Sequence, residues 1–331
     1  MADLAKTPFV RELASSDKKI RDKATDSLAL FLRSKTDLSL LELLKLWKGL
    51  FFCFYHSDRP LTQQALARNL SYSLVPTLPR STVHRFLRAF WITIGREFHS
   101  IDRLRLDKYL LLIRSYVGVA FQIFLKDKSS STQANGDAST KKRKREESAK
   151  DKKRSKSKSK KNGKRNAQDD DQEDETAADR QTQTQSSSDS NGDAWTDLKT
   201  YLDIISEGPL NPLNFDPNQP TLDEKNGIIP MPHGPDGLRY HILDLWIDEL
   251  EKVLEFDDEG KPVGELPIDL LLAPVERLKK EGLHKPVRTR AAETLSDERL
   301  VQWGFREGVV VSKDEEEEES SEEEWGGFGD D

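Results

Sequence analysis

Apolar side chains recur at helical spacing through the first 128 residues. One set predicts a helix with Ser16 as its N-cap and an apolar face made of Ile20, Ala24, Leu28 and Phe31. Ser39, with Glu42 three residues later, has the pattern of a capping box that begins a second helix. Apolar residues cover more than half of that helix's circumference, which predicts a central position. They are Leu43, Leu46, Trp47, Leu50, Phe51 and Phe54.

Three more helices are expected in this part of the chain. Pro60 suits the first position of a helix holding Leu61, Leu66 and Leu70. Ser81 is the expected cap of the next helix, which is apolar at Val83, Phe86, Leu87, Phe90, Trp91 and Ile94. The last runs from about Asp102 to Phe124 and is apolar at Leu106, Tyr109, Leu110, Ile113, Val117 and Phe121.

Helical spacing resumes near the end of the chain. It predicts helices over 195–205, 238–254, 266–278 and 287–303, and an extended crossing over 208–236, which contains seven prolines. Pairs of helices recur about every 40 residues, in the range of HEAT repeats. We therefore expect an all-α fold of helical hairpins, similar to HEAT or armadillo repeats.

Two polar tracts separate and end the helical parts. Residues 129–193 contain no large apolar side chain, and 314–331 begin with nine acids in eleven positions. Such tracts cannot bury enough apolar surface to offset the entropy of ordering. We expect a helical domain over 1–128, a disordered linker over 129–193, a second helical part over 194–313 that packs on or extends the first, and a disordered tail over 314–331.

Charge is distributed unevenly, although the net charge of the chain is only −7. Residues 1–128 are basic, as is the linker over 141–165, whereas the linker over 169–193 and the chain after 194 are acidic. This asymmetry indicates nucleic acid as a partner of the basic half. It indicates basic partners, or solvation, for the acidic half.

The basic part of the linker is the strongest compositional signal. Such clusters of Lys and Arg act as nuclear import signals or bind phosphates. We expect this one to bind a nuclear import receptor, through Lys141, Lys142, Arg143, Lys144, Arg145, Lys152, Lys153 and Arg154.

Arginines of the first helical part are candidates for RNA contact. Residues 61–96 hold five arginines and no acid, which predicts a surface of unneutralised arginine that suits phosphate. The RNA-binding candidates are Arg68, Arg80, Arg85, Arg88, Arg96, Arg103, Arg105 and Lys108. Asp102 and Asp107 are interleaved with the last three, which favours a salt-bridged helix junction slightly over an RNA site there.

The sequence carries no motif of an enzyme. It lacks a P-loop, a G-x-S-x-G, an H-E-x-x-H and a GxGxxG pattern, so we expect no catalytic residue, cofactor, metal or small-molecule substrate. The lone Cys53 lies in an apolar run and is expected to be buried. The most apolar stretch, 40–55, is interrupted by charges, so no membrane span is expected. Ser312, Ser320 and Ser321 each precede a glutamate by three residues, which makes them candidates for phosphorylation.

Several segments resemble the nucleolar ribosomal RNA processing protein 1 family. The resemblance is carried by the opening helix at 16–24, by 45–53, and by the run Ile101-Asp102-Arg103-Leu104-Arg105-Leu106-Asp107-Lys108-Tyr109. After the linker it resumes at Gly237-Leu238, Tyr240-His241 and 244–251. It covers about 9–125 and 237–303, and the long Lys/Ser insertion departs from it.

The resemblance implies a helical, repeat-like protein of the nucleolus and nucleus. It implies a non-catalytic assembly factor of the large (60S) ribosomal subunit precursor, required for pre-rRNA processing around the internal spacer and 5.8S region. Its implied partners are pre-rRNA of the large subunit, other assembly factors and ribosomal proteins. The alternative is a nuclear helical adaptor that binds only proteins, whose basic tract serves as an address.

Overall fold

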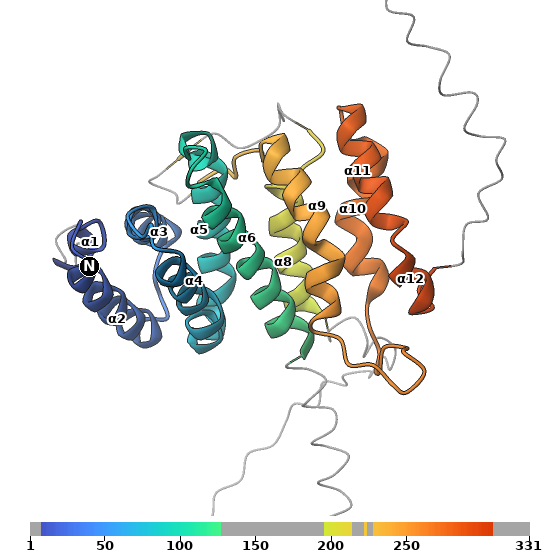
Figure 1. Ribbon diagram of the computed structural model, residues 1–331, viewed down its shortest axis with the longest axis horizontal. Coiled ribbons are helices and arrows are strands. Elements are labelled where there is room, and N and C mark those ends of the chain that lie inside the picture. The colour runs from blue at the N-terminus through green and yellow to red at the C-terminus, as the bar shows by residue number, and fades with distance from the viewer. Residues whose placement is uncertain (1–7, 127–194, 214–221, 224–227, 307–331) are drawn as a thin grey trace, which may run out of the picture.

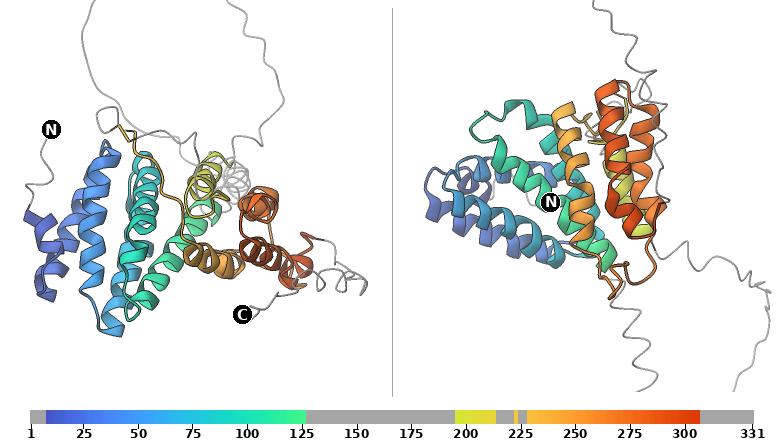
Figure 2. Two further views of the ribbon diagram at one scale, coloured as in Figure 1. Left: turned by 90° about the horizontal axis from the view of Figure 1, so that it is seen from above. Right: turned by 45° about the vertical axis from the view of Figure 1, so that its right-hand side comes forward.

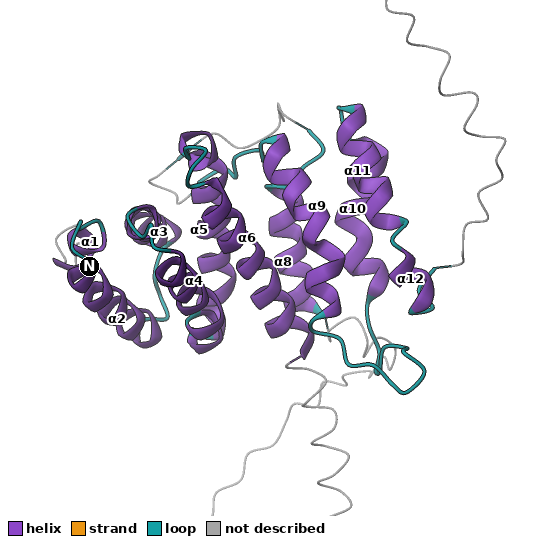
Figure 3. Cartoon of the chain, viewed as in Figure 1, coloured by secondary structure: helices purple, strands orange, loops and turns teal. Residues whose placement is uncertain are grey.

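The computed structural model describes residues 8–126, 195–213, 222–223 and 228–306. The described residues form helices joined by loops and contain no β-strand, only two isolated bridges, Asp223–Ile228 and Phe256–Pro262. The all-α prediction is therefore confirmed (Figure 3). The basic and acidic parts of the linker and the acidic tail lie outside the described residues.

The helices form a row of antiparallel pairs that runs along the long axis of the molecule (Figure 1). Their bounds are α1 Pro8–Leu13, α2 Lys18–Ser34, α3 Leu40–Tyr55, α4 Pro60–Arg68, α5 Arg80–Glu97, α6 Leu106–Phe121, α8 Thr196–Glu207, α9 Asp236–Glu251, α10 Ile268–Glu281, α11 Lys285–Leu295 and α12 Glu298–Gln302. Short 3-10 turns lie at Val75–Thr77 and Phe98–Ser100. Two π-helical segments, Asn69–Ser73 and Gln122–Lys126, extend α4 and α6.

The row has two layers, which Figure 2 shows from two further sides. One layer is built from α3, α5, α8 and α10, each of which contacts the next. The other is built from α4, α6, α9 and α11 in the same way. This is the arrangement of a helical-hairpin repeat of the HEAT or armadillo kind. Helix α8 packs on α5 and α9 packs on α6, so both helical parts contribute to one hydrophobic core.

Helix starts follow local sequence, with two corrections. The capping box of Ser39 and Glu42 is present, and Pro60 occupies the first turn of α4 as predicted. The cap of α2 is Asp17 and not Ser16, because the Asp17 carboxylate accepts a hydrogen bond from the Lys19 amide. Ser81 lies inside α5, which follows Pro79 without a side-chain cap.

Most of the apolar residues that the sequence predicted to face the core are buried in the structure. All six apolar residues predicted for α5 are buried, and so are Cys53 and Trp47. On α2 the face is rotated, because Ile20 is exposed and Leu32 is buried in its place. The expected helix over 287–303 is divided at Ser296 and Asp297 into α11 and α12.

Helix α6 is a long, strongly apolar helix of the core. With its extension it spans Leu106–Leu125, and by length and composition it could cross a membrane. However, 78% of its apolar window is buried by the other helices, as in the central helix of a folded domain. It begins at Leu106, four residues later than predicted, because Asp102 and Arg105 form a turn in front of it.

Candidate nucleic-acid interface and charged helix junction

Two of the predicted RNA-binding arginines on α5 contact α8. Arg88 donates hydrogen bonds of 2.6 Å to both carboxylate oxygens of Glu207. Arg80 forms an ion pair of 3.2 Å with Asp197 in the first turn of α8. These acids lie more than 100 residues away in the sequence, so the expectation of an unneutralised arginine surface over 61–96 is wrong at these two positions.

Arg85, another predicted RNA-binding residue of α5, donates hydrogen bonds to main-chain carbonyls. Its guanidinium donates to the main-chain carbonyls of Leu38, at 2.7 Å, and of Thr36, at 3.1 Å. It also donates to the carbonyl of Ser81 in its own helix at 3.2 Å. Arg85 thereby satisfies the Leu38 carbonyl of the connection between α2 and α3, and it shares the Thr36 carbonyl with the hydroxyls of Ser81 and Thr82.

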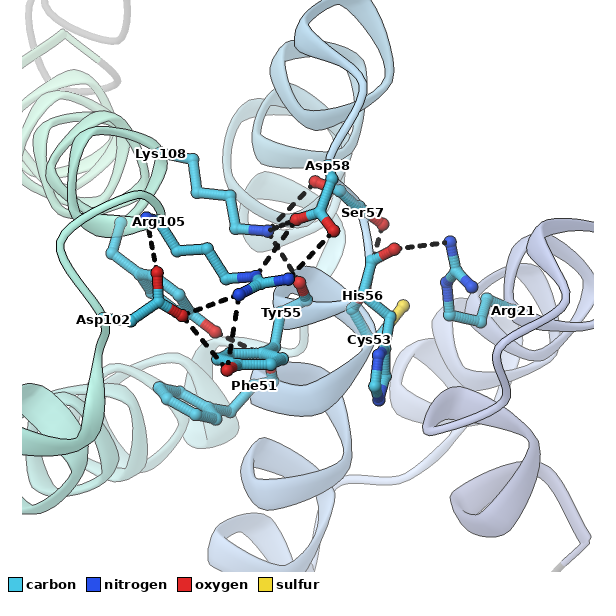
Figure 4. A network of polar contacts seen from close by, with 11 residues as sticks. Arg21, Phe51, Cys53, Tyr55, His56, Ser57, Asp58, Asp102, Arg105 and Lys108 are labelled. Atoms are coloured by element: carbon cyan, nitrogen blue, oxygen red, sulfur yellow. Dashed lines mark hydrogen bonds and ion pairs between the residues drawn. The ribbon is translucent and has the colours of Figure 1, made fainter.

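Arg105 and Lys108 form a junction between two connections that join neighbouring helices (Figure 4). Arg105 Nη1 lies 2.7 Å from Asp102, and its Nε and Nη2 each lie 3.1 Å from one oxygen of Asp58. The guanidinium also stacks over the ring of Tyr55, 4.4 Å from its centroid. The connection between α3 and α4 is therefore tied to the connection between α5 and α6.

Lys108 is the buried member of this junction, with only 3% of its side chain exposed. Its ammonium donates to the carbonyls of Tyr55 and Ser57, at 2.7 and 3.1 Å, and to Asp58 at 2.9 Å (Figure 4). These three acceptors satisfy all three ammonium hydrogens. The C-terminal carbonyls of α3 thus receive a buried positive charge, which also suits the helix dipole.

The pKa values of the junction reflect these contacts. Hydrogen bonds from Lys108 and then Arg105 lower the pKa of Asp58, and the hydrogen bond from Arg105 lowers that of Asp102. Burial lowers the pKa of Lys108, an effect that Asp58 opposes. The salt-bridged junction favoured by the sequence is present, with Asp58 as a partner that the sequence did not identify.

Three of the eight RNA-binding candidates have exposed side chains that could contact RNA. Arg68, Arg96 and Arg103 are exposed and make no hydrogen bond or ion pair with any residue that the structure describes. They lie at the end of α4, in the last turn of α5 and before α6, respectively. They are therefore the members of the predicted set whose charge the described fold does not use.

Arg68 borders a surface pocket with a volume of about 380 Å³. The other basic side chains of its lining are Arg114 of α6 and Lys252, which follows α9, and Tyr72 contributes a partly exposed ring. Tyr72 lies on a π-helical segment, a rare conformation that is frequent at functional sites. Burial, with the negative charge of Glu249, raises the pKa of Tyr72 to about 12, so its hydroxyl stays protonated at neutral pH.

A buried carboxylate forms the floor of this region and joins the two helical parts. Glu249, 1% exposed, accepts from Arg114 Nε at 2.5 Å and from Lys252 Nζ at 2.6 Å. Arg114 also donates to Asp248 at 3.0 Å. A Cβ on Gly118 would press on the ends of the Tyr72 and Glu249 side chains, so a larger residue there would displace both. The sequence gives no sign of this cluster, because Arg114 and Glu249 lie 135 residues apart.

Other sequence-predicted residues cannot be placed. The nuclear import candidates, from Lys141 to Arg154, and Ser312, Ser320 and Ser321 lie outside the described residues. Within the described ranges, no group of three or more His, Cys, Asp or Glu side chains is arranged to hold a metal ion.

Comparison with known proteins identifies a family model and several relatives. The model described as "Nucleolar protein, Nop52" matches residues 4–141 and 222–327. Human ribosomal RNA processing protein 1 homolog B is 28% identical over 254 residues, which are 75% of this chain and 23% of that protein. Human homolog A is 36% identical over 120 residues, 35% of this chain and 26% of that protein. A Dictyostelium discoideum homolog is 33% identical over 89 residues, 27% of this chain and 18% of that protein.

The matches differ in how much of each protein they include. The chain spans about a quarter of the length of the two human relatives. The two segments matched by the family model contain nearly all of the described helices, except α8 at Thr196–Glu207.

Proposed function

Because the chain belongs to the nucleolar protein Nop52 family, and is accordingly a protein of the nucleus and nucleolus, we propose that it is a non-catalytic assembly factor of the large (60S) ribosomal subunit precursor. It binds pre-rRNA and other assembly factors, and it is required for processing around the internal spacer and 5.8S region. The observation that carries this proposal is the family match on both sides of the linker.

A direct RNA contact is supported by the pocket beside Arg68. Its lining combines the unpaired Arg68, a partly exposed Lys252 and the ring of Tyr72. Basic side chains that contact phosphates, together with an aromatic ring on which a base stacks, are the elements of single-stranded RNA recognition. Arg96 and Arg103 add charge elsewhere on the first helical part.

The alternative, an adaptor that binds only proteins, also has an observation in its favour. Five of the eight predicted RNA-binding side chains already hold the fold together: Arg80, Arg85, Arg88, Arg105 and Lys108. What remains is three dispersed arginines, which is a small electrostatic footprint for a nucleic-acid surface.

Binding of the full chain to a single-stranded pre-rRNA fragment, titrated at several salt concentrations, distinguishes the two. We compare the wild type with a variant carrying Arg68→Ala, Arg96→Ala and Arg103→Ala. The matched control carries Lys279→Ala, Lys280→Ala and Lys285→Ala, an equal loss of charge on exposed residues of the last helical pair.

We expect the arginine variant to bind more weakly and with a shallower salt dependence. The slope of log K against log salt concentration falls by about 0.7 for each lost phosphate contact on single strands. The control variant should retain the wild-type slope. Equal slopes for all three proteins would favour the adaptor that does not contact RNA through these residues.

A further inference from the structure

The connection between α5 and α6 holds a leucine in solvent. Leu104 is 94% exposed, and its neighbour Arg103 is exposed too. The adjacent Arg105 is fixed by Asp58, Asp102 and the ring of Tyr55, so this connection is tied to the fold at that point. Because the backbone beside Leu104 is already ordered, binding at this point loses little backbone conformational entropy, which favours a partner contact.

Two other exposed apolar side chains lie in segments that the same junction joins. Leu61, 81% exposed, lies three residues after Asp58 in the first turn of α4. Phe52, 37% exposed, makes an edge contact with Tyr55, the ring that Arg105 covers. We call Phe52, Arg59, Leu61, Arg103 and Leu104 the turn surface. Its three apolar members come from segments that the junction of Figure 4 holds together.

The turn surface carries positive charge that the described fold does not neutralise. Arg59 and Arg103 are exposed and form no hydrogen bond or ion pair with described residues. The nearby carboxylates of Asp58 and Asp102 already accept hydrogen bonds from Arg105 and Lys108. Asp107, in the first turn of α6, is a further exposed acid of this region, so Arg59 and Arg103 leave an excess of one positive charge. A ligand for this surface therefore combines apolar side chains with negative charge.

We propose that the turn surface binds the chain's own acidic tail, residues 314–331. The tail places nine acids over 314–324 and then Trp325 and Phe328, so it provides both properties that the surface requires. Aromatic anchors beside a charge-complementary rim are characteristic of peptide docking. The inference goes beyond the proposed function and does not depend on RNA binding.

The length of the tail permits this contact. The 18 residues over 307–324 span up to about 60 Å when extended, at roughly 3.3–3.6 Å per residue. The described chain ends at Arg306, after α12, whose Arg299 pairs with Glu251 at the end of α9, whereas the turn surface lies at the start of α6. Three contacts between neighbouring helices, from α11 to α4, amount to about 30 Å sideways, and the 16 residues of α6 add about 24 Å along the helices, so the direct separation is about 40 Å. The acidic stretch therefore reaches the turn surface with Trp325 and Phe328 at its end.

Photo-cross-linking of the full chain tests the proposal. Phe328 is replaced by the photoreactive aromatic p-benzoylphenylalanine, and cross-linked peptides are identified by mass spectrometry after irradiation. We expect cross-links to 52–61 and 98–107 of the same molecule, and fewer of them as the salt concentration rises. Cross-links confined to other surfaces, or as abundant when the acids of 314–324 are replaced by glutamine, would overturn the proposal.

Variants of the surface provide the second measurement. Leu61→Ser with Leu104→Ser should lower the cross-link yield by about tenfold, the effect of losing one well-buried leucine contact. Leu30→Ser, on a leucine of α2 that is 66% exposed, is the matched control and should not change the yield. Because all three leucines are exposed, loss of folding is not expected, and circular dichroism verifies this for each variant.

Other occupants of the turn surface give distinct results. When isotopically heavy and light chains are mixed, cross-links between them would indicate a second copy and contradict binding within one chain. If the paired leucine substitutions weaken RNA binding but leave the cross-link yield unchanged, the surface belongs to RNA and the proposal fails. Arg103 is shared with the RNA-binding candidates, so the variants used here substitute only leucines and the tail, and leave Arg68, Arg96 and Arg103 in place. Failure here is therefore distinguishable from failure of the proposed function.

Discussion

Trp47 connects α3 to both neighbouring helices of the core. It is 1% exposed, its indole nitrogen donates to the carbonyl of Phe86 at 3.1 Å, and its ring lies 5.0–5.3 Å from those of Phe90 and Tyr116. The site is enclosed by rigid aromatic rings, which cannot collapse into the space that a smaller residue would leave.

Trp47→Ala is therefore expected to lower the free energy of unfolding by about 3–5 kcal/mol. Chemical denaturation followed by circular dichroism measures this loss. Leu30→Ala, on an exposed residue of α2, should remain within about 0.5 kcal/mol of the wild type. A loss of less than about 1 kcal/mol for Trp47→Ala would show that the indole is not packed as described.

Lys108→Met tests the buried charge of the helix junction. Methionine keeps most of the volume but leaves the carbonyls of Tyr55 and Ser57 without a donor, so we expect a loss of about 1–3 kcal/mol. Lys45→Met removes a charge from an exposed position of α3 and should have little effect. Equal stability of the two variants would mean that Lys108 contributes only its hydrocarbon chain.

Residue-level prediction from sequence succeeded where the cause is local. The capping box of Ser39 and Glu42 and the buried face of α5 depend on residues within one helix. The partners of Arg88 and Arg114 could not be predicted, because Glu207 and Glu249 lie 119 and 135 residues away. The α2 cap was misassigned to Ser16 because the adjacent Asp17 also suits a cap.

At the scale of elements, the contact between α6 and α9 unites the two helical parts. His241 of α9 hydrogen-bonds to the carbonyl of Leu110 at 2.9 Å. Burial lowers the pKa of His241 below its ordinary value, an effect opposed by its hydrogen bond to Leu110 and by Asp244 and reinforced by Arg114. The neutral imidazole is therefore the form that the folded protein favours.

This shift makes the stability of the α6–α9 contact depend on pH. The unfolded chain binds a proton at His241 near pH 6.5, before the folded chain does, so stability falls as pH drops from about 6.5 toward the lower folded pKa. His241→Gln should reduce the loss of stability between about pH 7 and 5, whereas the exposed His99→Gln should not. Identical pH profiles for the wild type and His241→Gln would contradict this interpretation.

Element boundaries were predictable only in part. The break between α11 and α12 was missed because apolar residues continue at helical spacing across Ser296 and Asp297. There the Asp297 carboxylate caps α12, while Arg299 joins Asp248 and Glu251 of α9. The start of α12 is thus fixed by the Asp297 cap and by the ion pairs of Arg299 with α9, neither of which the apolar periodicity indicates.

At the scale of the whole molecule, we propose that 1–128 and 194–313 form two parts of one folding unit. Helices α8 and α9 pack on α5 and α6, and the ion pairs of Arg88 and Arg114 cross between the parts. We therefore expect both parts to unfold in one transition. The basic tract over 141–165 and the acidic tract over 314–324 lie outside the described helices.

Deletion of 141–165 tests whether the basic tract is the nuclear address. The deletion removes 15 basic residues and lies outside the described helices, so we expect an unchanged fold and a protein that accumulates in the cytoplasm. Fluorescence microscopy of the tagged chain measures its location, and an equally long deletion over 169–193 is the control. Nuclear accumulation of the first variant at the wild-type level would contradict the prediction.

The proposed function requires that the chain contacts precursor RNA of the large ribosomal subunit. Ultraviolet cross-linking in cells, followed by sequencing of the RNA attached to the tagged full chain, tests it most directly. We expect enrichment of precursor sequences around the internal spacer and 5.8S region, and loss of that enrichment in the variant with Arg68→Ala, Arg96→Ala and Arg103→Ala. Precursor RNA recovered no better than from an untagged strain would contradict the claim and leave a protein-binding adaptor.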